Sequence, residues 1–216
     1  MAKAIVKNSH FILSGHKYFM GRAENIRLGT YGEKRTSPLY KNYLDGQSNI
    51  PMLNFNIEKP TIVEIDFEKS KKADFNIDAN YKVAGGTIGY SYENMKQGKL
   101  ALIKMIIQSK EITDFINNDE DLLEEFKSYK IPRVANQVFV VVEASFAETF
   151  SSKADFKANF EKGILTVEAN TEAGASGKST LTISPGTVFA YGIVKPVFNK
   201  DKSKITKFET DQWGMG

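Results

Sequence analysis

The sequence predicts an α+β fold, namely a twisted, mostly antiparallel sheet with two extended amphipathic hairpin regions and a few helices. Three observations support this fold class. The 216 residues are 41% hydrophobic and 25% charged, which is typical of one globular domain with a sizeable core. Polar and apolar residues alternate in two segments that both begin KADF, at Lys72 and at Lys153. One stretch, at about 110–129, has apolar residues at helical spacing.

The first 41 residues form a basic N-terminal segment. They contain eight Lys or Arg residues and two Glu residues, which gives a local net charge of +6, whereas the rest of the chain carries −3. A basic segment attracts phosphate, either of anionic lipid or of nucleic acid. An incidental bias on a solvated surface is the alternative interpretation of the same charges.

An extended chain is predicted for residues 60–83. In residues 74–83, Asp and Asn side chains alternate with apolar ones, so a strand here would have one apolar and one polar face. Gly85 and Gly86 favour a reversal of the chain, and residues 87–108 are expected to return as a strand with a second turn near Gly98. This pattern defines the first hairpin region.

The helical stretch at about 110–129 is expected to consist of two pieces. Its apolar stripe is interrupted by the polar run NNDED at 117–121, and Pro132 lies beyond its end. The following segment, QVFVVVEASF at 137–146, is almost continuously apolar and rich in β-branched residues. It predicts a central strand that is buried on both faces.

The second hairpin region is predicted from residues 153–162, a turn at Gly163 and a returning strand, ILTVEANT. After a Gly/Ser-rich turn, the segment TLTISPGTVFAYGIVKPVF predicts a strand, a Pro-Gly turn and another strand. Residues 199–216 are polar and show no strong pattern. Within this tail, Phe208 and Trp213 are the residues expected to anchor it on the sheet.

Motifs for catalysis or for cofactor binding are weak in this sequence. GASGKST resembles a phosphate loop, but Glu172 stands where the first glycine of that motif is required, and a strand is expected to follow it. The acidic run NNDEDLLEE lacks the glycine and the spaced ligands of a calcium loop. His10 and His16 have neither a nucleophile nearby nor a recognised metal spacing. We therefore predict no catalytic residues, cofactor or metal, and the chain is not expected to be an enzyme.

The compartment is predicted from what the sequence lacks. The chain has no cysteine, which excludes disulfides and cysteine-based metal sites. It has neither a secretory signal nor an apolar run of about 20 residues. A cytoplasmic location is the expectation.

The two hairpin regions allow two interpretations. A strand that spans a bilayer needs about 9–11 residues with one apolar and one polar face, in hairpins that can join a closed barrel. Residues 74–83 meet this requirement, and residues 154–171 nearly do. The alternative is a pair of ordinary amphipathic hairpins that cover a soluble core.

Three segments resemble parts of the gasdermin pore-forming domain, in the same order. KSTLTISPGTVFAYGIVKPVF is similar to the two strands that close the sheet of that domain. LLEEFKSYKIPRVANQVFVVVEASF resembles the helix and the strand before its second membrane hairpin, and KVAGGTIGYSYENM resembles the glycine-rich tip of its first. The agreement covers roughly residues 60–198, and each motif is short.

The resemblance implies a pore-forming protein with a gasdermin-like domain at 1–198 and a short tail, with regulation as one possible role, at 199–216. Such a protein binds acidic membrane lipids, forms a large homo-oligomer and refolds its hairpin regions into a membrane β-barrel, in cell death or antiviral defence. It would move from the cytoplasm to the membrane on activation, and it would not bind nucleic acid. The implied lipid-binding residues are Lys3, Lys7, Lys17 and Arg22. The implied membrane-insertion residues are Phe75, Ile77, Tyr81, Val83, Phe156, Phe160, Leu165 and Val167.

The chain also departs from the family pattern. Only 19 residues follow Val197, where animal gasdermins carry a large helical repressor, and no cysteine is present for the lipid modification of the bacterial relatives. Repression by the tail, an unrepressed form, and control by a partner such as an activating protease all remain open. The alternative function is a non-enzymatic β-rich structural or assembly protein that uses its sheet edges.

Overall fold

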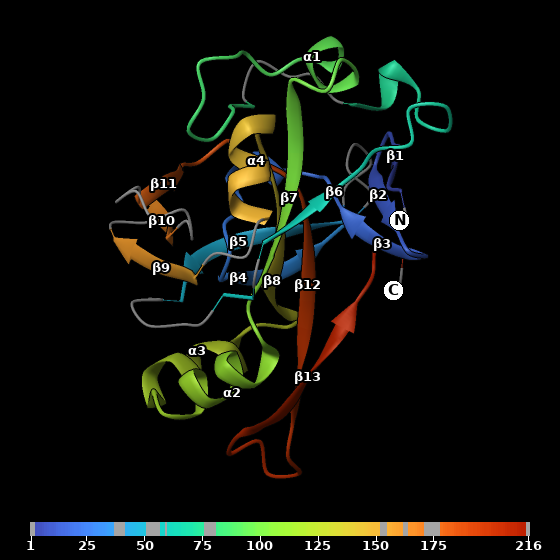
Figure 1. Ribbon diagram of the computed structural model, residues 1–216. Helices are drawn as coiled ribbons and strands as arrows, with labels where there is room; N and C mark the ends of the chain where they lie inside the picture. The colour runs from blue at the N-terminus through green and yellow to red at the C-terminus, as the bar shows by residue number, and fades with distance from the viewer. Residues whose placement is uncertain are drawn as a thin grey trace.

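A curled, ten-stranded antiparallel sheet forms the centre of the protein, and a separate three-stranded sheet lies beside it (Figure 1). The computed structural model describes residues 3–36, 42–50, 57–58, 60–75, 81–151, 155–161, 164–170 and 178–214. The strands are β1 (Ile5–Lys7), β2 (His10–Leu13), β3 (His16–Phe19), β4 (Thr30–Arg35), β5 (Tyr43–Asn49), β6 (Thr61–Val63), β7 (Leu100–Ile106), β8 (Pro132–Glu143), β9 (Asp155–Glu161), β10 (Ile164–Asn170), β11 (Lys178–Ile183), β12 (Val188–Phe198) and β13 (Ile205–Asp211). The helices are η1 (Ala23–Asn25) and η2 (Lys72–Phe75), both 3₁₀, and α1 (Tyr92–Lys96), α2 (Ser109–Asn117), α3 (Glu120–Ser128) and α4 (Ala144–Ser151).

The two longest strands, β8 and β12, pair with each other, and each changes its partner along its other side. The free side of β8 pairs first with β4 and then with β7. The free side of β12 pairs with β3 at Tyr191 and with β13 from Ile193 onward. The sheet therefore forks on both sides of its central pair, and this forking accompanies the curl.

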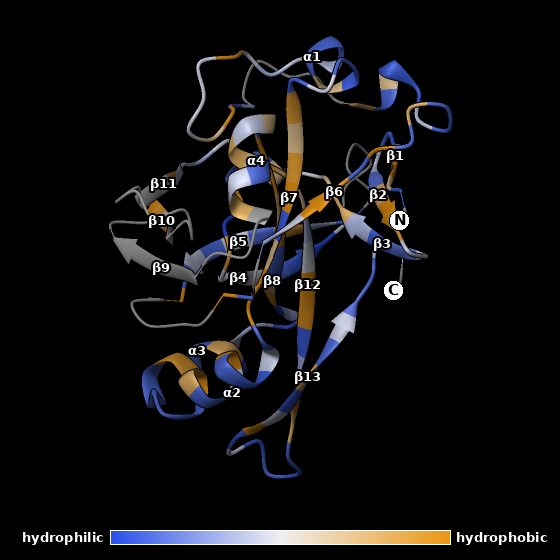
Figure 2. Ribbon diagram, in the orientation of Figure 1, coloured by the Kyte–Doolittle hydropathy of each residue, from blue (hydrophilic) through white to orange (hydrophobic). Residues whose placement is uncertain are grey.

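The central strands are apolar on both faces, as the sequence predicts for residues 137–146. Along β8, Val138, Val140 and Val142 belong to one core cluster, whereas Phe139 and Val141 belong to another. The first cluster includes side chains of α2, α3, α4 and the small sheet, and the second includes those of β1, β2, η2 and α1. Figure 2 shows this distribution of hydropathy along the ribbon, with β7 and much of β12 hydrophobic and β13 largely hydrophilic.

The predicted division of the 110–129 stretch into two helices is confirmed. Asn118 ends α2, and the Asp119 side chain then caps α3 by accepting a hydrogen bond from the Leu122 backbone N–H at 3.0 Å. The polar run that interrupts the apolar stripe therefore makes the helix junction. Ile112 and Ile116 of α2, with Phe126 of α3, are fully buried against the sheet.

The predicted strand at 74–83 is wrong at its start, because Lys72–Phe75 form the 3₁₀-helix η2. The Asp74 side chain accepts a hydrogen bond from the Lys71 backbone N–H, and such local bonds compete with a strand ladder. Residues 76–80 lie outside the described residues. The returning strand is also shorter than expected: Ser91 caps the helix α1, and β7 begins only after the predicted turn at Gly98, whose φ is +72°.

Three further elements differ from the prediction. The apolar run of β8 ends at Glu143, and residues 144–151 form helix α4. Strands β11 and β12 exist on either side of the Pro-Gly turn, but they belong to different sheets and do not form a hairpin. The polar tail, which shows no strong sequence pattern, forms strand β13, and this strand pairs with β12.

The second predicted hairpin is confirmed as β9–β10, with seven register pairs from Ile164↔Glu161 to Asn170↔Asp155.

Candidate functional site

The predicted lipid-binding lysines lie in or next to the meander β1–β2–β3. Its register pairs Ile5 with Ile12 and Ile12 with Lys17. Lys7 follows Ile5 by two positions, so Lys7 and Lys17 lie on the same face of the meander. Lys3 and Lys17 are exposed, while Lys7 donates a hydrogen bond from Nζ to the Lys69 carbonyl at 3.2 Å.

Arg22 differs from these lysines because its charged group is paired with a carboxylate. Its guanidinium lies 3.5 Å from the Asp45 carboxylate and stacks over the Tyr43 ring at 4.5 Å. The residue also has a left-handed backbone, with φ of 56°, at the start of η1. Arg22 is therefore separated in role from the three lysines with which the sequence grouped it.

The described residues of the first group of predicted membrane-insertion residues contact the core: Phe75 belongs to the second core cluster, Val83 packs against it, and Tyr81 packs against the first. Phe75 is fully buried, stacks on Phe67 with ring centroids 5.8 Å apart and meets the edge of Tyr92 at 4.8 Å. Tyr81 and Val83 are partly buried. Ile77 lies outside the described residues. In this conformation the described residues of this group do not form a strand.

The second group lies in the β9–β10 hairpin. Leu165 and Val167 of β10 are 4% and 1% exposed and contribute to the first core cluster. Phe156 and Phe160 belong to β9, but their side chains are not among those described. Burial also alternates along the neighbouring strand β11, where Leu181 and Ile183 are buried while Thr180 and Thr182 are exposed. The small sheet therefore has one apolar face toward the core and one polar face toward solvent.

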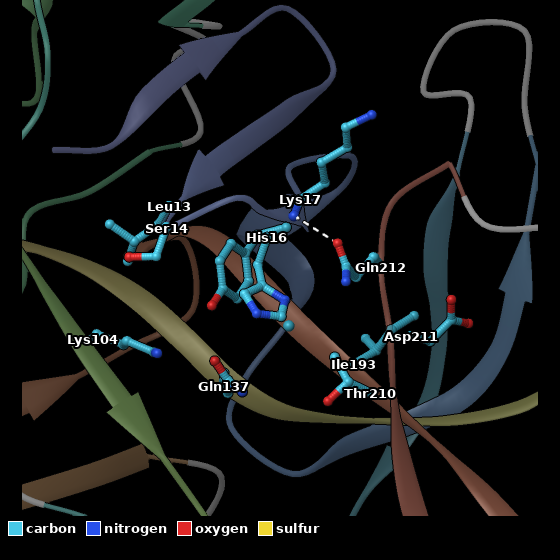
Figure 3. Close-up of a pocket in the computed structure, with 12 residues that line it drawn as sticks. Leu13, Ser14, His16, Lys17, Lys104, Gln137, Ile193, Thr210, Asp211 and Gln212 are labelled. Atoms are coloured by element: carbon cyan, nitrogen blue, oxygen red, sulfur yellow. Dashed lines mark hydrogen bonds between the residues drawn. The ribbon is translucent and has the colours of Figure 1, made fainter. Parts of the chain in front are cut away.

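A pocket of about 300 Å³ opens where β3 and β13 diverge along β12 (Figure 3). Tyr18, Lys104, Gln137 and Gly192 line it from β3, β7, β8 and β12. A Cβ at Gly192 would lie 3.2 Å from the Gln137 Cβ and 3.3 Å from the Tyr18 ring, so any side chain there would enter the space between them. The remaining lining comes from both sides of the fork, namely Leu13, Ser14, His16, Lys17, Ile193, Thr210, Asp211 and Gln212.

Two polar groups face this pocket, and neither forms a direct hydrogen bond or ion pair there with the residues that the structure describes. Gln137 Oε1 is buried and accepts no hydrogen bond from the described residues. Lys104 forms no ion pair within the described part of the chain; its Nζ lies 5.8 Å from the centre of the Tyr18 ring. Burial lowers the pKa of Lys104, partly offset by the charge of Glu58, and burial raises the pKa of Tyr18. Figure 3 shows the ends of Lys104 and Gln137 directed toward the same space.

Asp211 contributes to the pocket wall but directs its carboxylate away from the pocket (Figure 3). Lys34 Nζ of β4 lies 3.0 Å from Asp211 Oδ1, and Arg133 Nε of β8 lies 2.6 Å from Oδ2. All three side chains are largely buried, with exposed fractions of 7% for Lys34, 12% for Arg133 and 4% for Asp211. Two cations therefore compensate this single carboxylate.

The tail is further held by its predicted aromatic anchors. Trp213 stacks on His10 with ring centroids 4.2 Å apart, and its backbone N–H donates to the Lys17 carbonyl at 3.0 Å. Phe208 and Trp213 both pack against the first core cluster. The C-terminal strand and the N-terminal meander thus meet at the edge of the pocket.

Sequence reasoning missed Lys104 and Gln137, whose ends lie in the pocket, whereas it named Lys17 at the mouth only as a lipid contact. The available signal was a polar residue inside an apolar strand: Lys104 interrupts LALIKMII, and Gln137 precedes VFVVV. Neither position has a motif around it, and the pocket is assembled from strands that are distant in sequence.

Comparisons of the chain with protein-family models, curated proteins and solved structures give no match. Among the helices of the described residues, none is both long and apolar enough to cross a membrane. The functional argument therefore depends on the residues and their geometry.

Proposed function

We propose that this protein permeabilises membranes. In this proposal it binds acidic lipid through the lysines of the β1–β3 meander, assembles into a large homo-oligomer and inserts its two hairpin regions into the bilayer. The observation that carries the proposal is the β9–β10 hairpin. It is amphipathic, and within the described residues its strands pair only with each other and with β11.

This arrangement allows the hairpin to leave the protein at a limited cost. Its release breaks side-chain packing at Leu165 and Val167 and, unless β11 moves with it, the β10–β11 ladder, but it breaks no hydrogen-bonded ladder with the ten-stranded sheet among the described residues. The same apolar face that is buried in the core would then contact lipid, and the polar face would line an aqueous lumen. The backbone N–H and C=O groups at the outer edges of the inserted hairpins would form hydrogen bonds with neighbouring copies of the protein, which requires an oligomer.

The meander supports the lipid-binding step. Lys7 and Lys17 lie on one face, with Lys3 exposed just before β1. Each cation close to an anionic leaflet contributes about 1 kcal/mol of attraction. Arg22 is a weaker candidate, because Asp45 already neutralises it.

The direct test is release of a dye from vesicles that contain an acidic lipid, with vesicles of neutral lipid as the control. Wild-type protein is expected to release dye from acidic vesicles only, and to form rings visible by electron microscopy. Changing Lys3, Lys7 and Lys17 together to Glu should abolish both vesicle binding and leakage. A control with the same charge change, Lys99→Glu with Lys110→Glu and Lys130→Glu, uses exposed lysines outside the meander and should retain both.

Two results would contradict the proposal. Absence of leakage across acidic lipid compositions, with the protein folded, would argue against permeabilisation. Ordered assemblies without leakage would instead support the alternative, a β-rich assembly protein that uses its sheet edges.

A further inference from the structure

The pocket at the fork between β3 and β13 has the size of a small-molecule site. Its volume of about 300 Å³ is at the lower end of the range for ligand pockets, which suits a compact molecule. Gly192 keeps the floor free of a side chain between Gln137 and Tyr18. The pocket is therefore a shaped cavity in the sheet and not a gap between loops.

The charge of the pocket favours an anion. Lys104 is the cation whose end lies inside it, and no described carboxylate pairs with Lys104. The one carboxylate in the wall, Asp211, is turned away and compensated by Lys34 and Arg133. At the mouth, His16 and Lys17 are exposed, and the Lys17 side chain extends outward from the pocket (Figure 3). A ligand anion would thus meet a positive charge that Glu58 offsets only in part, in a partly desolvated space where charge-assisted hydrogen bonds are strong.

The pocket also offers an acceptor. The buried Gln137 Oε1 needs a donor, and its side chain points to the same space as Lys104. A ligand that carries a hydroxyl next to its anionic group would satisfy both residues at once. Leaving a buried carbonyl oxygen unpaired is costly, so this second contact adds selectivity for such a ligand.

We propose that this pocket binds the phosphate monoester of a small polyol, with Lys104 holding the phosphate and Gln137 accepting from a hydroxyl. A monoester carries up to two negative charges, which gives it an advantage over a carboxylate at a single buried ammonium. The phosphate can belong to a free metabolite or to a lipid headgroup, since the mouth lies beside Lys17 of the meander. The proposal does not depend on membrane permeabilisation.

The test is calorimetric titration of the full chain with glycerol 3-phosphate, compared with inorganic phosphate, glycerol and acetate. Glycerol 3-phosphate is expected to bind most tightly, inorganic phosphate more weakly, and glycerol and acetate not measurably. Sedimentation with vesicles that contain phosphatidic acid, a monoester, or phosphatidylglycerol, a diester, forms the lipid arm. Binding of glycerol 3-phosphate indicates a free metabolite, and a Lys104-dependent preference for phosphatidic acid alone indicates a headgroup; either result supports the shared chemistry.

Matched variants separate the two contacts. Lys104→Met keeps most of the length of the side chain without its charge and should weaken binding of both phosphate compounds by at least about tenfold. Gln137→Leu should weaken glycerol 3-phosphate but leave inorganic phosphate unchanged. Lys99→Met, at an exposed lysine just before β7, is the control and should have no effect. Thermal unfolding of each variant verifies that it is folded.

The proposal is overturned if neither glycerol 3-phosphate nor phosphatidic acid binds, or if Lys104→Met binds them as the wild type does. Equal binding of acetate and glycerol 3-phosphate would overturn the specificity for phosphate. Vesicle leakage is not measured in these experiments, so failure here and failure of the proposed function can be distinguished.

Discussion

Lys104 illustrates how a single residue can oppose the stability of the strand that contains it. The strand β7 is otherwise largely apolar, and Lys104 lies between the buried Ile103 and Met105 with its ammonium half-buried beside Tyr18. Burial lowers its pKa below the ordinary value of 10.5, which means that folding disfavours its charged form. A residue kept at such a cost suits a binding role better than a structural one.

We expect Lys104→Met to be more stable than the wild type at pH 7. The folded-state pKa of Lys104 is lowered, so its destabilising effect is fully present below that pKa and disappears as the pH rises toward 10.5. The stability difference between variant and wild type should therefore shrink over this upper range of pH. Thermal unfolding of both proteins from pH 7 to pH 10.5 measures it. A variant less stable than the wild type at pH 7 would show that Lys104 stabilises the fold.

At the scale of elements, the β9–β10 hairpin has opposite requirements in its two environments. In the folded protein the buried Val167 holds it against the core, while in a bilayer the same side chain would face lipid. Substitutions at this position can thus weaken the docking of the hairpin with or without harming insertion.

Two substitutions at Val167 are expected to have opposite effects on leakage. Val167→Ala removes about 2 kcal/mol of buried apolar packing but stays apolar, so it should release dye faster than the wild type. Val167→Asp also weakens docking, but it places a charge on the lipid face and should reduce leakage by about tenfold or more. Thr166→Asp, on the opposite face of β10, is the control and should leak as the wild type does. If leakage simply follows thermal stability across all three, the hairpin does not insert.

The sequence predicted those elements whose signals are local. The boundary between α2 and α3 follows from the cap at Asp119, and the burial of β8 on both faces follows from its continuous apolar run. The helix η2 was missed because Phe75 packs against Phe67 and Tyr92, which come from other segments of the chain. The pocket was missed for the same reason, since no spacing along the chain relates Lys104 to Gly192.

The whole molecule is joined at Asp211, which connects strands from the beginning, middle and end of the chain. Lys34 of β4 and Arg133 of β8 both bind its carboxylate. The polar tail forms β13 although its own sequence has no strand pattern, because the residues that hold it are distant in sequence. Removal of one partner from a buried ion pair leaves the other charges uncompensated.

We expect Asp211→Ala to destabilise the protein by about 3–5 kcal/mol, which corresponds to a fall in Tm of roughly 10 °C. Glu209→Ala on the same strand is the control, because Glu209 is 40% exposed and pairs with Lys195 and Lys207 at the surface. Loss of these surface pairs should leave the Tm nearly unchanged. Equal losses in the two variants, measured by thermal and denaturant unfolding, would contradict a special role for Asp211.

The position of β12 has a consequence for how the chain acquires its fold. This strand lies between β3 and β8, and the Tyr191 hydroxyl donates to the Gly21 carbonyl, 170 positions earlier, and accepts from the Leu44 N–H. During synthesis on the ribosome, the N-terminal meander and β8 therefore lack their common neighbour until β12 has emerged. Contacts so distant in sequence make folding slow. The nascent chain will expose unpaired strand edges throughout that interval, so we expect its yield in the cell to depend on chaperones that bind such edges.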